Sequence, residues 1–196
     1  MKGGTLALIV IIAILLIGGC ATCNVQRTMV GLDESVKSKW GEVQNQYQRR
    51  ADLIPNLVNT VKGAANFEKS TLEAVVQARA SATSLKVDPN DLSPEKIKEF
   101  QSRQGELSQA LGRLLMVTEN YPELKANQNF LALQDQLEGT ENRITVARKG
   151  FNDAVQEYNT KVRSFPNNLL AGMFGFHPKG MFEADAASQK APQVQF

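Results

Sequence analysis

Hydrophobic residues, with a few polar ones among them, recur at alternating steps of three and four along three stretches of this 196-residue chain. Steps of this size place the side chains on one face of an α-helix. The three faces comprise Val36, Trp40, Val43, Tyr47, Arg50, Ile54, Leu57, Val61 and Ala64, then Ile97, Phe100, Gln104, Leu107, Leu111, Leu114, Thr118 and Tyr121, then Phe130, Leu133, Leu137, Thr140, Ile144, Ala147, Phe151, Ala154, Tyr158 and Lys161. No stretch alternates with period two over a useful length, so we do not expect a sheet. The spacing therefore predicts an all-α protein.

Cap and turn signals predict where the first long helix begins and ends. Asp33 is the expected N-cap, because carboxylates suit the positive end of the helix dipole. Pro55 lies inside the pattern and removes an intrahelical hydrogen bond, so we expect a helix kink there. The helix should break at Gly63 or just beyond it.

Similar signals delimit the remaining helices. A shorter helix is expected over residues 68–85, and Ser93-Pro94 predicts the start of a long one that ends before Pro122. The last long helix should run from about Ala126 to about Phe165. Three long helices and a shorter one with short connections predict an antiparallel bundle with coiled-coil-like crossing angles.

The N-terminal segment carries a different signal. Residues 5–23 contain no charge, and residues 6–17 are an unbroken apolar run. The sequence Ile17-Gly18-Gly19-Cys20 looks like a lipobox, which makes Cys20 a lipidation candidate behind a signal peptide. The uncharged length also approaches the roughly 20 residues of a transmembrane helix. Both chemistries predict a membrane anchor, and both stay open.

These signals divide the chain into four parts. We expect a membrane anchor over residues 1–23, a linker over 24–32, the helical bundle over 33–166 and an apolar C-terminal tail over 167–196. The tail either folds back over an end of the bundle or enters a bilayer or another subunit, because its side chains should not stand in water. The residues expected to make this tail contact are Met173, Phe174, Phe176 and Phe182.

Charge and chemistry exclude several classes of function. With 22 Lys and Arg against 20 Asp and Glu, the chain lacks the basic excess typical of nucleic-acid binding, so we expect no nucleic acid as a partner. The single histidine, His177, has no partner triad, and no Glu-x-x-His pair, glycine-rich phosphate loop or Gly-x-Ser-x-Gly turn occurs. We therefore expect no metal, no cofactor and no enzymatic activity.

One charged residue lies within the first hydrophobic face. Arg50 needs a carboxylate or carbonyl partner there, and Glu138 and Glu141 share one face of the last helix. We favour a structural ionic link that fixes the register of the helices, with a ligand site as the alternative.

A second unusual face combines small residues. Gly105, Ser108 and Gly112 lie together beside the hydrophobic face of the helix that starts at Pro94. Such a face allows close approach of another helix, either from the same bundle, which we favour, or from a second chain.

Two blocks of sequence resemble the LemA family of bacterial membrane-associated proteins. The first is residues 45–63, NQYQRRADLIPNLVNTVKG, and the second comprises QGELS, ENYPELKAN, LEGTENRI and VRSFP at 104–108, 119–127, 137–144 and 162–166. The resemblance implies an N-terminal membrane segment before an antiparallel helical domain. It brings no enzymatic activity and no binding residues, and it suggests a role in maintenance of the cell envelope.

Two hypotheses of function follow. The first is a non-catalytic scaffold or adaptor, anchored in a bacterial membrane, that contacts other envelope proteins or itself as a homo-oligomer. The side of the membrane stays open, with the extracytoplasmic side slightly preferred. The alternative is a ligand-binding or catalytic module acting on lipid or cell-wall fragments, with its site between helices near Arg50 and Glu138. A pocket lined by converging polar groups distinguishes the two.

Overall fold

The computed structural model describes residues 3–63 and 67–183, and within them the regular structure is entirely helical. The helices are α1 (Gly3–Lys62), α2 (Lys69–Ser84), α3 (Pro94–Thr118), α4 (Pro122–Lys125), α5 (Gln128–Arg163) and α6 (Asn167–Met173). The predicted all-α class is confirmed. Two short helices that the spacing did not predict, α4 and α6, follow the long α3 and α5.

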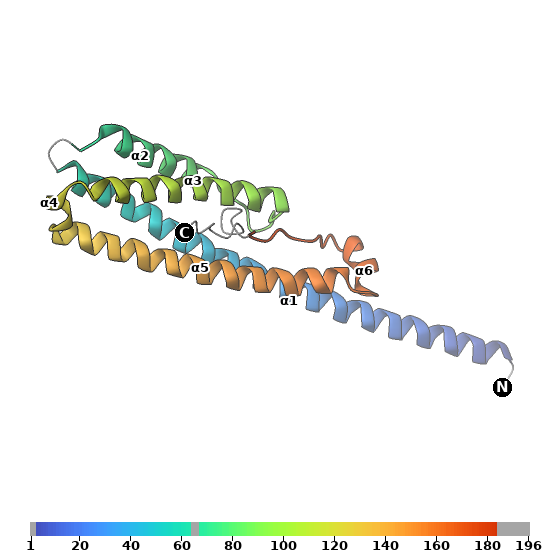
Figure 1. The fold of residues 1–196 in the computed structure, drawn as a ribbon. Coiled ribbons are helices and arrows are strands. Elements are labelled where there is room, and N and C mark those ends of the chain that lie inside the picture. The colour runs from blue at the N-terminus through green and yellow to red at the C-terminus, as the bar shows by residue number, and fades with distance from the viewer. Residues whose placement is uncertain (1–2, 64–66, 184–196) are drawn as a thin grey trace, which may run out of the picture.

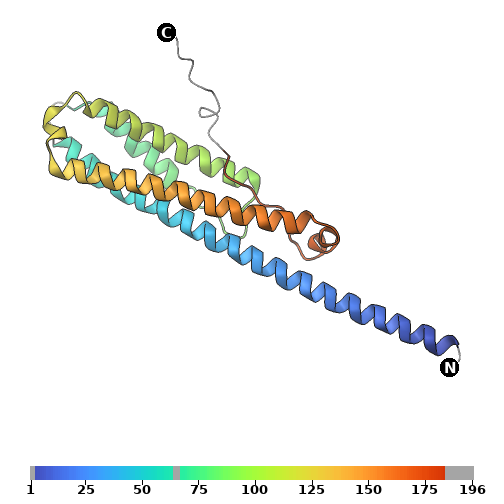
Figure 2. The same cartoon turned by 60° about the horizontal axis from the view of Figure 1, so that its bottom comes forward.

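The long helices pack as two antiparallel pairs (Figure 1). Helices α1 and α5 lie side by side over most of their shared length, and α2 and α3 form the second pair beside them. The one-turn helix α4 reverses the chain between α3 and α5 at one end, and α6 lies at the other end beside α1 (Figure 2). This arrangement confirms the antiparallel packing that the spacing predicts.

Helix α1 is continuous over 60 residues, which corrects two expectations. Residues 24–32 are helical and not a linker, so Asp33 is inside a helix and is not an N-cap. The reason is that Val25, Met29 and Leu32 extend the three-four spacing backwards from the bundle, and Met29 is fully buried. The helix also continues through the exposed Pro55, where the kink stays a prediction.

The interior consists of two hydrophobic clusters at different levels of the bundle. One surrounds Trp40, whose ring centroid lies 5.1 Å from that of Phe100 and 5.3 Å from that of Phe151. The other lies toward α4. Its buried members are Ile54, Leu57, Val58, Val61, Leu72, Val75, Ala82, Leu107, Leu111, Leu114, Leu124, Phe130 and Leu137.

After α6, the chain returns along the bundle as a C-terminal strap, defined here as residues 177–183. The side chain of Asn159 exchanges two hydrogen bonds with the backbone of Lys179, at 2.8 Å each. Asn152 does the same with Phe182, at 2.9 Å each, and Gln101 with Glu183, at 2.8 and 3.1 Å. Side-chain amides thus satisfy the strap's backbone where no strand is available to do so.

The four residues of the expected tail contact divide into two groups. Phe182 is buried among the rings around Trp40, and Phe176 is partly buried against the same cluster. Phe174 and Met173 are exposed, at 37% and 81%. The chain thus folds back along the bundle through the strap and not over its end, and the outer side of α6 is exposed among the described residues.

The N-terminal part of α1 projects beyond the bundle (Figures 1 and 2). Large apolar side chains are exposed along it, namely Leu8, Ile9, Val10, Ile11, Ile12, Leu15 and Leu16. Over the part of the chain that the structure describes, no helix has the length and apolarity needed to cross a membrane. The backbone of Cys20 lies within α1, its side chain is outside the described part, and Cys23 is an exposed free thiol. Residues 1–2 of the expected anchor and 184–196 of the expected tail also lie outside the described residues.

Candidate functional site

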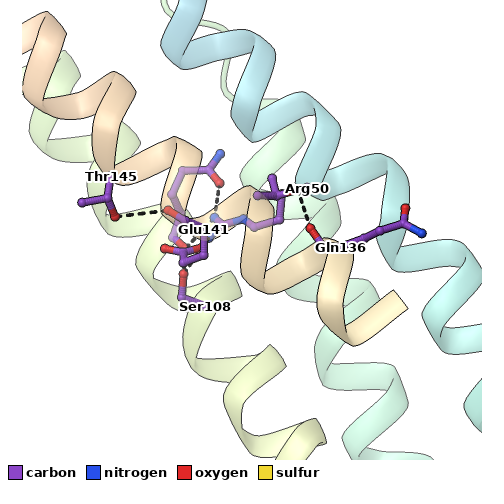
Figure 3. Close-up of polar contacts among 7 residues, drawn as sticks. Arg50, Ser108, Gln136, Glu141 and Thr145 are labelled. Carbon is purple, nitrogen blue, oxygen red and sulfur yellow. Dashed lines mark hydrogen bonds and ion pairs between the residues drawn. The ribbon is translucent and has the colours of Figure 1, made fainter. Parts of the chain in front are cut away.

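Arg50 is the buried charge at the centre of the bundle. Its place on the hydrophobic face of α1 directs the side chain inward, where it is 3% exposed. One terminal nitrogen, Nη1, donates to Ser108 Oγ at 2.8 Å and to Glu141 Oε2 at 2.9 Å (Figure 3). The other, Nη2, donates to the side-chain and main-chain oxygens of Gln104, at 2.7 and 3.2 Å. The guanidinium thus joins α1 to α3 and α5 through charge-assisted hydrogen bonds.

A further hydrogen bond brings α2 into the same layer. Gln104 Nε2 donates to the main-chain oxygen of Ala82 at 3.2 Å, so its side chain accepts from α1 and donates to α2. Along α1, Arg50 falls between Tyr47 of one hydrophobic cluster and Ile54 of the other. All four major helices therefore meet at one polar layer that separates two apolar clusters, an arrangement suited to fixing helix register.

The aromatic side of the layer is Tyr47. Its ring centroid lies 5.0 Å from the guanidinium carbon of Arg50, within the range of a cation–π contact. Burial raises the pKa of the Tyr47 phenol, against the opposing influence of Arg148 and Arg50. The ring therefore stays neutral beside the cation. Arg50 Nε has no hydrogen-bond partner among the described residues.

The two predicted carboxylate partners have different positions. Within the described residues, Arg50 pairs with Glu141 and not with Glu138. The Glu141 side chain is 54% exposed, so the ion pair joins a buried cation to an anion at the surface. The sequence pattern did not predict Ser108 and Gln104 as partners of Arg50, although Gln104 interrupts the hydrophobic face of α3 and so indicates a polar neighbour.

A groove between α3 and α5 opens beside this layer, with a volume of about 420 Å³. It combines a polar end with an apolar wall, and its lining residues are Arg50, Ser108, Leu111, Gly112, Leu115, Gln134, Leu137, Glu138 and Glu141. A pocket of the size that the alternative function requires is therefore present, with polar groups at one end only.

The small-residue face of α3 borders the same groove. A Cβ atom built at Gly105 or Gly112 would meet no neighbouring atom within 4 Å in the described part of the chain. The expected close packing of another helix of the bundle is therefore wrong at the two glycines, whereas Ser108 between them accepts a hydrogen bond from Arg50 of α1. The reason is that α3 turns its larger apolar side chains, such as Leu107 and Leu114, toward the core and leaves the glycines outside.

Groups for metal chemistry are not assembled in residues 3–63 and 67–183. Within these ranges, no three His, Cys, Asp or Glu side chains are placed to hold a metal ion. His177 is exposed and lies beyond α6, as the first residue of the strap.

The fold and its polar layer define the class of protein: an all-α antiparallel bundle built on one long N-terminal helix that carries a buried arginine. The chain belongs to the LemA family, whose sequence model matches residues 39–196. The resemblance of the two sequence blocks is thereby confirmed.

Curated relatives are similar at a distance. "Magnetosome protein MamQ 2" of Paramagnetospirillum magneticum strain AMB-1 is 26% identical over 204 residues, which cover 95% of this chain and 75% of that protein. "Protein LemA" of Metamycoplasma hominis is 26% identical over 163 residues, covering 79% and 70%. "Magnetosome protein MamQ" of Magnetospirillum gryphiswaldense is 25% identical, covering 90% and 72%.

Proposed function

We propose that this protein is a membrane-anchored, non-catalytic helical scaffold of the bacterial envelope that contacts other membrane proteins or copies of itself. One observation carries the proposal. The projecting, apolar part of α1 and the bundle-forming part of α1 are one uninterrupted helix (Figure 1). The apolar segment and the bundle are therefore held in a fixed relation, as a scaffold on a membrane requires.

The exposed side chains support the membrane anchor. Seven large apolar residues between Leu8 and Leu16 are exposed on the projecting helix, and such a surface should not stand in water. A bilayer removes it from water if the helix enters the membrane. Lipidation of Cys20 also places the bundle at the membrane, after removal of this segment as a signal peptide. The extracytoplasmic side is the preferred location of the bundle.

Uncovered surface on the bundle supports contact with partners. The glycine face of α3 is open, and the apolar side chains of Met116 and Val146 are 70% and 72% exposed on α3 and α5. Anchoring concentrates molecules along a surface, so weak contacts through such patches become effective. Envelope maintenance is the process that we propose for these contacts.

The proposal is tested by cross-linking the full chain in native membranes and identifying the adducts. We expect adducts with other envelope proteins or with a second copy. Recovery of isolated monomers only, from a membrane fraction that contains the protein, would contradict a scaffold. Fatty-acid labelling of the wild type and of Cys20→Ala distinguishes the two anchors, because only a lipidated chain loses its label in the variant.

A second candidate function is binding of an amphipathic lipid or cell-wall fragment in the α3–α5 groove. It is favoured by the convergence of Arg50, Glu138 and Glu141 on an apolar wall around a volume of about 420 Å³. Gly112→Leu places a large side chain in the groove, and its Cβ atom would have no neighbouring atom within 4 Å in the described part of the chain. A ligand of this kind should raise the melting temperature of the wild type and not of the variant. An unchanged melting temperature of the wild type with both lipids and cell-wall fragments would contradict this function.

A further inference from the structure

Helix α6 has one covered side and one uncovered side. Asn167 and Ala171 are one helical turn apart and are buried, at 8% and 2% exposure. Leu169 and Met173 are also one turn apart. Each follows a buried residue by two positions, which places it on the other side of the helix, and they are 65% and 81% exposed. The short helix therefore presents an apolar side away from the bundle.

Exposed aromatic residues flank the helix at both ends. Phe165 precedes α6 and is 80% exposed, and Phe174 follows it and is 37% exposed. Together with Leu169 and Met173, they form what we call the α6 patch. Large apolar side chains grouped in this way mark a surface that is covered by something else.

The position of the patch indicates what covers it. Helix α6 contacts α1 at the end of the bundle from which α1 projects (Figures 1 and 2). Ser164, just before α6, shares a surface hollow with Thr28 and Leu32 of α1. The apolar, uncharged part of α1 ends immediately before this level, at Arg27. The α6 patch thus lies beside the boundary between the apolar and polar parts of α1.

The charges around this boundary that lack a paired partner among the described residues are mostly positive. Asp153, which lines the same hollow, is paired with Lys149 at 2.8 Å. Arg27 on α1 and Lys161 and Arg163 in the last turn of α5 are exposed cations, and Glu157 is an acidic neighbour one turn earlier on α5. Asp33 is already paired with Lys179 and Lys37. An apolar patch with exposed cations on the neighbouring turns of α1 and α5 complements a bilayer with anionic headgroups.

We propose that the α6 patch is a second membrane contact, which enters the headgroup and acyl-chain boundary of an anionic bilayer beside α1. This inference rests on the proposed membrane anchor and adds to it. A single helix leaves the bundle free to rotate and tilt on its anchor. Two contacts with one bilayer fix the orientation of the bundle and hence the face that it offers to partners.

Tryptophan quenching by brominated lipids tests the contact in the full chain. The protein is reconstituted in vesicles of phosphatidylethanolamine and phosphatidylglycerol, with Trp40 as a constant background because it is fully buried. Leu169→Trp reports on the patch. Met116→Trp is the matched control, because Met116 is 70% exposed near the end of α3 that adjoins α4. We expect brominated chains to lower the added emission of Leu169→Trp about twofold or more, and that of Met116→Trp hardly at all.

A third probe separates failure of this contact from failure of the anchor. Leu16→Trp lies on the projecting part of α1, so its quenching reports the anchor alone. Quenching at position 16 without quenching at 169 overturns the second contact and leaves the anchor intact. Absence of quenching at both positions overturns both the second contact and the insertion of α1 in the bilayer. Self-crosslinking through the patch, without quenching at 169, assigns it to a second copy and also overturns the lipid contact.

The charge requirement has its own control. Lys161→Gln with Arg163→Gln removes two exposed cations next to α6. Quenching at position 169 should then depend less on phosphatidylglycerol, while the Leu16→Trp signal stays unchanged. In Leu169→Trp with Lys161 and Arg163 intact, equal quenching with and without phosphatidylglycerol would overturn the anionic preference.

Discussion

Arg50 Nη1 lies 2.9 Å from Glu141 Oε2, and the two residues are 91 positions apart in the chain. The pair is asymmetric, because the Arg50 side chain is 3% exposed and the Glu141 side chain is 54% exposed. Loss of Glu141 and loss of Arg50 therefore have different consequences for stability. Removing the carboxylate leaves a cation buried, whereas removing the arginine leaves an anion that water can solvate.

Glu141→Ala should destabilise the bundle by about 2–3 kcal/mol, less than the roughly 3–5 kcal/mol of a fully buried pair. The reduction reflects the exposure of Glu141 and the hydrogen bonds that Arg50 keeps to Gln104 and Ser108. Thermal unfolding of the full chain in detergent, followed by circular dichroism, measures the effect. Glu138→Ala is the matched control, since Glu138 is exposed one turn away and should change stability by less than about 0.5 kcal/mol. Equal effects of the two substitutions would remove the special role of Glu141.

Arg50→Met should also destabilise the bundle, by about 1–3 kcal/mol, because the oxygens of Gln104 lose their donors. The double variant with Glu141→Ala should cost less than the sum of the single variants, because the buried cation is gone. Strict additivity in this cycle would contradict the ion pair. Unchanged melting of Arg50→Met together with lost cellular function would instead support a binding role for the arginine.

Phe182→Ala should loosen the C-terminal strap and cost about 3–5 kcal/mol. Phe182 is 5% exposed and its ring lies 5.5 Å from that of Phe151 and 6.1 Å from that of Trp40. The emission of Trp40, the single tryptophan, should move to longer wavelength as water reaches it. Met181→Ala is the control, because that side chain is 39% exposed. An unchanged Trp40 spectrum in Phe182→Ala would show that the strap does not seal the core.

Gly180→Ala should displace the strap from α3. An added Cβ would lie 2.6 Å from Pro94 Cα and 2.9 Å from Pro94 N, and backbone atoms at such distances cannot yield as a flexible side chain does. Faster hydrogen exchange of the amide at position 180, which in the wild type donates to the main-chain oxygen of Leu92 at 2.8 Å, measures the displacement. Gly172→Ala serves as control, because its Cβ would meet nothing within 4 Å. Equal exchange in the two variants would exclude close packing at Gly180.

Asp33 should make stability depend on acid pH. Burial raises the pKa of its carboxyl, but the hydrogen bonds and charges of Lys179 and Lys37 outweigh burial and lower the pKa below its ordinary 3.8. A folded-state pKa below the unfolded value contributes stability above the unfolded pKa, and this contribution is lost as pH falls through the folded pKa. Asp33→Asn should therefore lower the free energy of unfolding by about 1.5–3 kcal/mol near pH 7. It should also make this free energy depend less on pH below about pH 4, the acid limb of the stability curve.

Glu34→Gln is the control for Asp33→Asn. Glu34 also contacts Lys37, but its side chain is 64% exposed and Lys37 keeps Asp33. The control should leave the melting temperature and the acid limb nearly unchanged. Parallel acid limbs in the wild type and Asp33→Asn would contradict the pairing with Lys179.

The helical faces could be predicted from sequence, because burial of an amphipathic helix imposes its period on nearby residues. The prediction of a linker at residues 24–32 is wrong for a related reason. Polarity rises after the apolar segment, but Val25 and Met29 keep the bundle's spacing and so keep the helix. Composition changed at this boundary while periodicity did not, and periodicity determined the structure.

The strap and much of the polar layer could not be predicted. Gln101 and Glu183 are 82 positions apart, and their contact depends on backbone hydrogen bonds of an extended segment that has no period. Arg50 was recognisable because a charge in a hydrophobic face needs a partner. Its choice of Glu141 over Glu138 depends on the relative axial position of α1 and α5, which local spacing does not determine.

Site-directed photo-crosslinking in native membranes tests the central proposal, a bundle that acts by contact from a membrane anchor, most directly. A photoreactive residue at Gly112 samples the open face of α3, and one at Trp40 samples the closed core of the same full-length chain. We predict adducts with another envelope protein or with a second copy from position 112, and none between chains from position 40. Monomer alone from position 112, in membranes that contain the protein, would contradict it.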